Sequence, residues 1–434
     1  MIVFRPIARL ALFVTSVLCL TAFALPALGA QAAVPCDPAT DYATAAMAAY
    51  DAAEYEASLP DFFCAVALDP ENVDLHYAAT IANLRAGRIF SVFRYSNFLD
   101  SVAVERYDDM AQAGMNGLVT DPQDEQSAIL IAFAHYPILQ ADLNRILAIN
   151  PDSPVAALYA ASKAAYQDSD GAAAREAANR AVELAPDDPE VLLYASSILA
   201  NGLGDLDAAL ALTDRALELE PDSLAGIVAR ADNLRGQGEL EAATAEYARA
   251  IAMDPYDLTL LARRARLLQS AGDYAGAITD YANYLAANPG DPFSLSGLVE
   301  SALASGDSEH LTLAAQSFEA ARSEALDGDP LTADAPVTAA MTAGRLVRIP
   351  VRLEAGQEVT ISARAAEPAS LDPLILVVGP NGGALAFNDD VDANAGDYSA
   401  VVTFTPDQAG DYTILATHAG AGSEGEMTIR VEQP

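Results

Sequence analysis

Hydrophobic positions recur at helical spacing through most of the chain and at strand spacing near its C-terminal end. In "LAGIVARADNL" (224–234) the apolar side chains lie three and four positions apart, which predicts an amphipathic helix. In "RLVRIPVRL" (345–353) every second residue from Val347 to Leu353 is apolar, which predicts a strand. The pattern therefore predicts a multidomain chain, with an all-α region followed by an all-β sandwich.

The helical pattern repeats with a period of 34 residues. Each unit reads as two helices, the first ending at a glycine that can adopt the left-handed conformation and the second ending before a proline. One hairpin cannot bury its apolar face alone, so neighbouring units are expected to stack. The repeated residues are Gly204, Gly238, Gly272 and Gly306, Ala209, Ala243 and Ala277, and Pro186, Pro221, Pro255 and Pro289.

This combination of period, glycine, alanine and proline resembles the tetratricopeptide repeat family, most clearly over 155–308. The resemblance implies a helical solenoid whose regular units and capping helices occupy 152–325. Degenerate units extend it over 36–151, because "FFCAVALDP" (62–70) keeps part of the pattern. The spacing from Pro70 to Pro122 exceeds one repeat by about 18 residues, which places an insertion at about 88–101.

Beyond an Asp- and Pro-rich stretch, 326–336, read as a linker, the β region covers 337–434. "LDPLILVVGPNGGALAFNDD" (371–390) and "FTPDQAGDYTILA" (404–416) resemble the bacterial pre-peptidase C-terminal domain. The resemblance implies a jelly-roll-like, non-catalytic accessory β-sandwich for secretion, stability or surface attachment.

The N-terminal segment, 1–32, has the pattern of a signal peptide. Two arginines precede an apolar run, and "AQA" (30–32) fits a signal-peptidase site. A permanent membrane anchor is the alternative, since the run is just long enough to span a bilayer. No later segment is apolar enough to do so, and we expect an exported protein without an integral membrane segment after cleavage, in the bacterial periplasm or outside the cell.

Charge limits the expected partners, and cysteine content fits an exported protein. The net charge is −38, with one lysine, so nucleic acid and anionic lipid are not expected partners. A solvated acidic surface explains this charge, and cation binding is a narrower explanation. Cys36 and Cys64 are predicted to form a disulfide between the ends of the first helical hairpin, worth about 3–4 kcal/mol for a loop of about 28 residues.

Signals for catalysis are weak. The four histidines stand far apart in the sequence, none at the spacing of a zinc-binding helix. The chain has no Gly-x-Ser-x-Gly, phosphate-binding loop or dinucleotide fingerprint. We therefore expect no enzymatic activity, no catalytic residue and no required cofactor.

Partner binding is the favoured function. In the tetratricopeptide family the first helix of each hairpin lines a groove, and the resemblance places nine residues of this chain there. Aromatic and cationic side chains among them suit an extended protein or peptide partner with acidic groups. Ordinary solvated helix surface is the alternative. The residues are Tyr159, Lys163, Tyr166, Tyr194, Asn201, Asp232, Arg235, Arg266 and Gln269.

An acidic stretch near the C-terminal end is a candidate Ca²⁺ site. Alternating oxygen side chains with a nearby glycine allow a loop to surround a cation that takes six to eight oxygen ligands. The spacing departs from that of an EF-hand, and an acidic hairpin turn accounts for the same residues. The candidate ligands are Asp389, Asp390, Asp392, Asn394 and Asp397.

These observations together predict an exported, non-enzymatic protein-interaction scaffold with an accessory β-sandwich. Two alternatives stay open: an accessory or regulatory subunit of a secreted hydrolase, and a calcium-stabilised structural surface protein.

Overall fold

A computed structural model describes residues 36–135, 138–322, 324–342, 344–366, 371–389, 398–419 and 425–432. These residues form two compact units, 36–237 (unit 1) and 238–432 (unit 2), and each is described by itself. The chain has an α-helical repeat region followed by a β region of two sheets, which confirms the predicted fold class. In the described part of the chain, no helix combines the length and apolarity needed to cross a bilayer.

Unit 1 consists of helices that pack mainly against their neighbours in sequence. It contains α1 (Tyr42–Asp51), α2 (Tyr55–Leu68), α3 (Val73–Arg85), α4 (Phe93–Val102), α5 (Arg106–Thr120), α6 (Glu125–Ala134), α7 (Gln140–Ile149), α8 (Pro154–Tyr166), α9 (Gly171–Leu184), α10 (Pro189–Ser197) with a π-helical extension (Ile198–Gly202), α11 (Leu206–Leu219) and α12 (Leu224–Gln237).

The repeated glycines and alanines have the roles that the sequence predicts. The four glycines have φ between +67° and +82°, a conformation that side chains with a Cβ rarely adopt. Ala209, Ala243 and Ala277 are fully buried, which lets the paired helices approach closely. The hairpins are therefore tetratricopeptide-like in their own geometry.

The predicted disulfide is confirmed. Cys36 precedes α1 and Cys64 lies in the last part of α2, and their Cα atoms are 5.3 Å apart. Both cysteines are buried, next to the cluster around Phe62 that holds the first hairpin together.

Replacing both cysteines with serine is expected to lower the free energy of unfolding of unit 1 by about 3 kcal/mol, because the 28-residue loop is no longer closed in the unfolded chain. Urea unfolding followed by circular dichroism measures this loss. Dithiothreitol is expected to give the same loss in the native protein and none in the double variant. Equal stability of native and double-variant protein would contradict the prediction.

Unit 2 begins with five helices and ends with the strands of the β region. The helices are α13 (Leu240–Met253), α14 (Thr259–Ser270), α15 (Tyr274–Ala287), α16 (Pro292–Ser305) and α17 (Ser308–Ala320). The strands are β1 (Glu324–Asp327), β2 (Val337–Met341), β3 (Arg345–Leu353), β4 (Val359–Ala365), β5 (Asp372–Val378), β6 (Ala384–Asn388), β7 (Ala400–Phe404), β8 (Gly410–Ala419) and β9 (Gly425–Glu432).

The strands form two sheets packed face to face. The first has the order β1-β3-β8-β5-β6 and the second β2-β9-β4-β7, and all their pairings are antiparallel except β1 with β3. Alternate residues of β3, from Val347 to Leu353, point into the sandwich core as the period-2 pattern predicts. Ile361 and Ile429 contribute to the same core from the second sheet.

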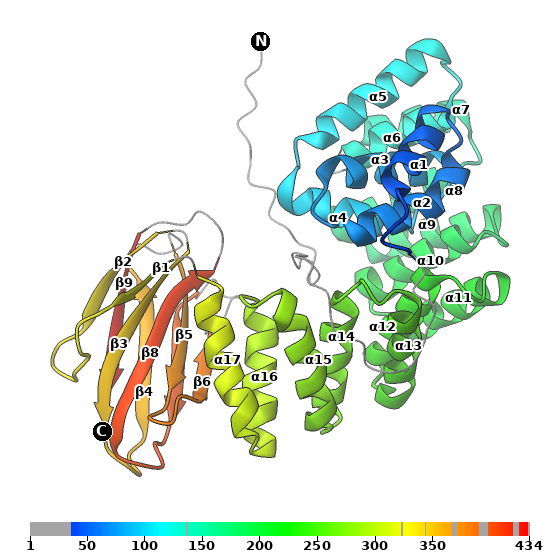
Figure 1. The fold of residues 1–434 in the computed structure, drawn as a ribbon. Coiled ribbons are helices and arrows are strands. Elements are labelled where there is room, and N and C mark those ends of the chain that lie inside the picture. The colour runs from blue at the N-terminus through cyan, green and yellow to red at the C-terminus, as the bar shows by residue number, and fades with distance from the viewer. Residues whose placement is uncertain are drawn as a thin grey trace. The chain divides into compact units, whose positions relative to one another are not determined.

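The first sheet is buried on both faces around its strand β5. Its other face shares a hydrophobic cluster with α15, α16 and α17, to which β5 contributes Leu374 and Leu376 and α17 contributes Phe318. Figure 1 shows α17 and α16 beside strand β6 of this sheet. An ion pair of 2.8 Å between Arg348 of β3 and Glu319 of α17 lies at the edge of this contact. The last helices and the β region therefore share one core.

The stretch 326–336, expected to be a linker, packs on the β region. Strand β1 includes its first two residues and pairs with β3. Leu331 is 2% exposed and belongs to the sandwich core. Leu331 also bridges to Val351, so hydrophobic burial holds this stretch in place despite its turn-forming composition.

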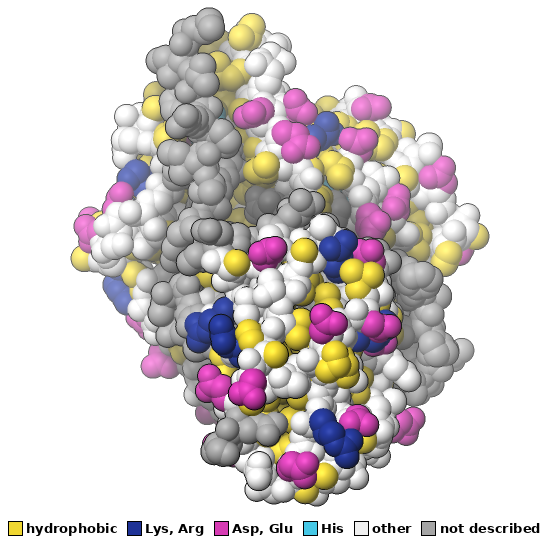
Figure 2. Space-filling model, turned by 90° about the vertical axis from the view of Figure 1, so that its left-hand side faces the viewer, with side chains coloured by type: hydrophobic (Ala, Val, Ile, Leu, Met, Phe, Trp, Pro, Cys, Tyr) yellow, Lys and Arg dark blue, Asp and Glu magenta, His cyan; other side chains and the backbone are white. Residues whose placement is uncertain are grey.

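The second sheet presents its outer face to solvent. Polar side chains such as Thr360 and Thr403, whose hydroxyl groups are 2.9 Å apart, lie on this face. On the side of the β region that Figure 2 presents, hydrophobic, acidic and basic side chains are interspersed. This mixture is typical of a solvated sheet face.

Candidate functional site

Two of the expected groove residues lie inside unit 1. Tyr159 is 2% exposed and Tyr194 is 7% exposed, and their rings are 6.2 Å apart within the largest hydrophobic cluster. Burial raises the pKa of Tyr159 well above its ordinary value. The expectation that these tyrosines present surface to a partner is therefore corrected, because neighbouring apolar side chains cover them.

The other expected groove residues of unit 1 lie at or near the surface. Lys163 is paired with Asp168, its Nζ 2.6 Å from Oδ2, and Arg235 lies 3.5 Å from Asp232. Tyr166 is half-buried, and Asn201 is exposed in the π-helical extension of α10. Partner binding by these residues stays a prediction.

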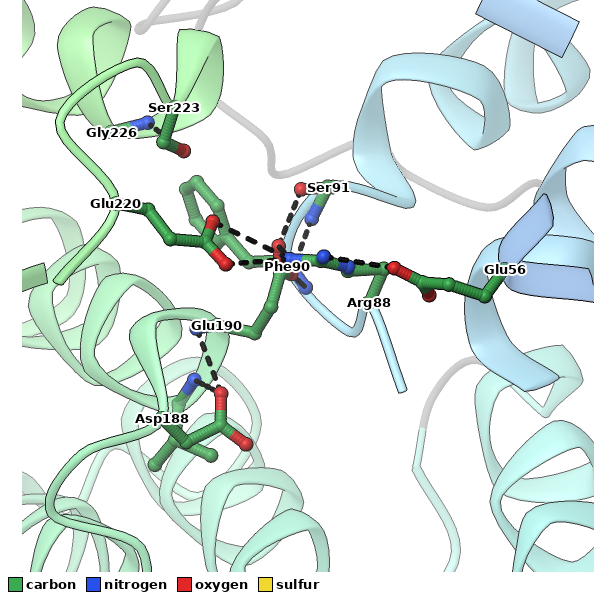
Figure 3. Close-up of polar contacts among 10 residues, drawn as sticks. Glu56, Arg88, Phe90, Ser91, Asp188, Glu190, Glu220, Ser223 and Gly226 are labelled. Atoms are coloured by element: carbon green, nitrogen blue, oxygen red, sulfur yellow. Dashed lines mark hydrogen bonds and ion pairs between the residues drawn. The ribbon is translucent and has the colours of Figure 1, made fainter. Parts of the chain in front are cut away.

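The inserted segment crosses from α3 to the N-terminal end of α10. We call residues 88–92 the strap. The carboxylate of Glu190, which is 4% exposed, accepts hydrogen bonds from the backbone N–H groups of Phe90 (2.7 Å) and Ser91 (2.9 Å). Its second oxygen accepts a bond of 2.6 Å from the Ser91 hydroxyl. Figure 3 shows Glu190 directed at the strap. One buried side chain thus satisfies three donors of the strap.

Arg88 connects the strap to two further helices. Its guanidinium lies 3.0 Å from Glu56 of α2 and 3.1 Å from Glu220 at the end of α11. Figure 3 shows the dashed contacts from Arg88 to both carboxylates. Glu190 is 3.9 Å from the same group. Burial opposes the charge of Arg88, but the hydrogen bonds and charges of Glu56 and Glu220 outweigh it, and the pKa of Arg88 is raised.

Apolar side chains of the strap and of the helix that follows fill the space among the repeats. Ile89 and Val92 are buried in the largest cluster, while Phe90 packs against the cluster around Leu192 of α10. Phe93, the first residue of α4, has its ring 5.7 Å from that of Tyr194. The insertion therefore covers residues that the sequence places on an open groove. Only its excess length signals this in the sequence.

In unit 2, α14 and α16 form a face that we call the α14/α16 face. Its residues are the half-buried Gln269 and the exposed Arg266, Phe293, Glu300 and Leu303. The Gln269 amide donates a hydrogen bond of 2.8 Å to Glu300 and accepts one of 2.9 Å from the Tyr281 hydroxyl. Phe293 is 60% exposed, and the guanidinium of Arg266 lies 5.7 Å from the centre of its ring. Arg266 is exposed and forms no ion pair with any residue that the structure describes.

The sequence prediction named Arg266 and Gln269 but not their equivalents in the next repeat. One period of 34 residues after Arg266 and Gln269 lie Glu300 and Leu303, and one period after Thr259, which the prediction did not name, lies Phe293. Leu303 is 44% exposed. The period applied to the named residues therefore identifies Leu303, whereas Phe293 corresponds to a position that the prediction left out.

The candidate Ca²⁺ ligands lie mostly outside the described residues, which include Asp389 but none of 390–397. Asp389 lies near Asp291, the N-cap of α16, and burial together with the charge of Asp389 raises the pKa of Asp291. Within the described ranges, no group of three His, Cys, Asp or Glu residues is arranged to hold a metal ion. Calcium binding stays a prediction.

If the predicted site exists, Ca²⁺ at about one hundred times its dissociation constant is expected to stabilise unit 2 by about 2.7 kcal/mol relative to chelator, because the ion binds only the folded state. Melting curves with CaCl₂ and with EDTA measure the shift, which Asp392→Asn with Asp397→Asn is expected to abolish. Asp407→Asn, in an exposed turn, serves as the control. An unchanged melting curve in the native protein would exclude the site.

Comparisons with known proteins add similarities for the helical region. No family model and no curated protein matches the chain. Among solved structures, the type IV pilus biogenesis factor PilW is 18% identical, with 49% of this chain and 92% of that chain covered and a TM-score of 0.38. Yeast Tom70 is 13% identical over 64% of this chain and 76% of its own, with a TM-score of 0.39.

A tetratricopeptide repeat protein from Parabacteroides merdae is 17% identical, covering 56% of this chain and 93% of that chain, with a TM-score of 0.36. Similarities at this level do not indicate what the chain binds. The chain's own geometry therefore provides the functional argument: tetratricopeptide-like hairpins, an insertion that fills unit 1, and an exposed α14/α16 face in unit 2.

Proposed function

We propose that the chain is an exported, non-enzymatic scaffold that binds a protein partner through the α14/α16 face. The observation that carries this proposal is the exposed Phe293 ring with the Arg266 guanidinium beside it. An exposed aromatic residue next to an arginine is typical of the few residues that dominate binding at interfaces.

The chemistry of this face indicates the kind of segment that it binds. Phe293 and Leu303 offer apolar contact area, and Arg266 offers donors for a carboxylate. A partner segment with an aromatic or aliphatic anchor and an acidic residue nearby meets both requirements. This agrees with the acidic peptide expected from the sequence and limits the contact to the part of the predicted groove that lies in unit 2.

Export is supported by the Cys36–Cys64 disulfide, since such bonds persist in oxidising compartments. The β region, for which the pre-peptidase C-terminal resemblance proposes an accessory role, stabilises the last helices through the core that it shares with them. Partner binding and helix stabilisation thus belong to the same unit.

A phage-displayed peptide library selected on the full chain tests the proposal. Selected peptides are expected to combine an acidic residue with an apolar anchor, and Phe293→Ala or Arg266→Glu should weaken their binding about tenfold. Leu313→Ala, 36% exposed on α17, and Arg249→Glu on α13 are matched controls and should change affinity less than about twofold.

Binding that is equally strong in all four variants would contradict the assignment of the face. A library that yields no binder would contradict the scaffold function at this face. Turnover of peptide or glycan substrates by the purified protein would contradict the non-enzymatic proposal.

A further inference from the structure

A cleft of about 620 Å³ opens in unit 1, beside the strap. Its walls include Tyr42 of α1, Pro60 and Phe63 of α2, and Tyr95 of α4. Arg88 and Asp222, which lies just before α12, complete the opposite side. This site is separate from the α14/α16 face, because all of its lining residues belong to unit 1.

Carboxylates outnumber cations around the cleft. Asp61 and Asp222 line it. The carboxylates of Glu56, Glu190 and Glu220 lie within 4 Å of the Arg88 guanidinium. Among the described residues of this region the cations are Arg88 and Arg94, so five carboxylates surround two guanidinium groups. Asp61 forms no ion pair in the part of the chain that the structure covers. The local field therefore favours a further cation.

The same region already holds cations in two ways. Arg88 is held between Glu56 and Glu220, each within about 3 Å of it. The Arg94 guanidinium lies 4.7 Å from the centre of the Phe63 ring, which is cation–π geometry. Carboxylates and aromatic rings at the cleft thus bind guanidinium groups supplied by the chain itself.

We infer that this cleft binds a basic, extended segment of a partner protein, with an arginine or lysine side chain placed near Asp61. The aromatic and proline side chains of the wall suit the aliphatic stem of that side chain and an apolar neighbour. A volume of about 620 Å³ exceeds what one basic side chain fills, which favours a peptide over a small polyamine. The inference is independent of the proposed function of the α14/α16 face.

Fluorescence anisotropy tests this with a labelled Gly-Arg-Leu-Arg-Tyr-Gly peptide and the full chain at about 0.15 M salt. Binding is expected to weaken about tenfold when the protein carries Asp61→Lys and about threefold with Asp61→Asn. Asp51→Lys is the matched control, since Asp51 is an exposed carboxylate at the end of α1 and does not line the cleft. It should change affinity less than about twofold.

Three outcomes would overturn the inference. Equal losses of peptide affinity with Asp51→Lys and Asp61→Lys would mean that the net charge of −38 attracts the peptide without a specific site. If spermidine displaced the peptide completely and bound with an affinity similar to that of the peptide, the cleft would be a simple cation site. If replacing the peptide's leucine and tyrosine with glycine left its affinity unchanged, the cleft would not contact apolar side chains of the peptide as inferred. Melting curves establish whether each variant is folded. If Asp61→Lys does not fold, the result with Asp61→Asn decides.

Discussion

Leu376→Asp is expected to lower the free energy of unfolding of unit 2 by about 5 kcal/mol or more. Leu376 is fully buried in β5, on the face that packs against α15, α16 and α17. The substitution removes apolar contacts and places a carboxylate inside a hydrophobic cluster. Urea unfolding followed by circular dichroism, on the full chain, measures the loss.

Because the helices and the sheet share one core, a second and more specific effect of Leu376→Asp is expected. Hydrogen exchange is expected to accelerate in α16 and α17 as well as in β5 of the Leu376→Asp variant, because Leu298 and Phe318 lose the surface they pack on. Thr403→Asp, at an exposed position of β7, is the control and should cost less than about 1 kcal/mol. Undisturbed protection of α16 and α17 would show that the helices do not depend on the sheet.

Glu190→Ala is expected to destabilise unit 1 by about 4 kcal/mol. The substitution leaves the N–H groups of Phe90 and Ser91 and the Ser91 hydroxyl without their acceptor. Hydrogen bonds to a charged group are worth about 1.5–3 kcal/mol each, and such losses do not add fully within one network. Thermal unfolding and hydrogen exchange of the strap amides measure the effect.

The matched control for this variant removes a carboxylate that meets the strap at the surface. Glu220 is 39% exposed and touches only the guanidinium of Arg88 among the strap residues, so Glu220→Ala should cost less than about 1 kcal/mol. Glu190→Gln is expected to lie between the two, because one amide oxygen can still accept. A loss below about 1 kcal/mol for Glu190→Ala would mean that apolar contacts alone hold the strap.

The two proposed binding sites differ in which of their side chains are exposed. In unit 1 the strap and α4 cover Tyr194, and the remaining cleft is acidic. In unit 2 the α14/α16 face leaves Phe293 open beside a cation without a carboxylate partner among the described residues. The helical repeats therefore present an acidic cleft in unit 1 and an apolar face with a cation in unit 2. These two surfaces suit partner segments of opposite charge.

The sequence alone determined the local structure. The 34-residue period fixed the hairpins, because left-handed glycines and helix-ending prolines act within a few residues of themselves. Alternation from Val347 to Leu353 identified which face of β3 is buried. Cys36 and Cys64 were close enough in the sequence, at the ends of one hairpin, for their disulfide to be predicted.

Contacts between distant segments were decided only by the tertiary structure. Nothing near Glu190 in the sequence indicates that it meets Phe90 and Ser91, about a hundred residues away. The run "LILVV" in β5 is apolar on both faces, a sign of burial on two sides, but its second covering layer is α16 and α17. Periodicity reports which face of an element avoids water, and it does not say which surface covers that face.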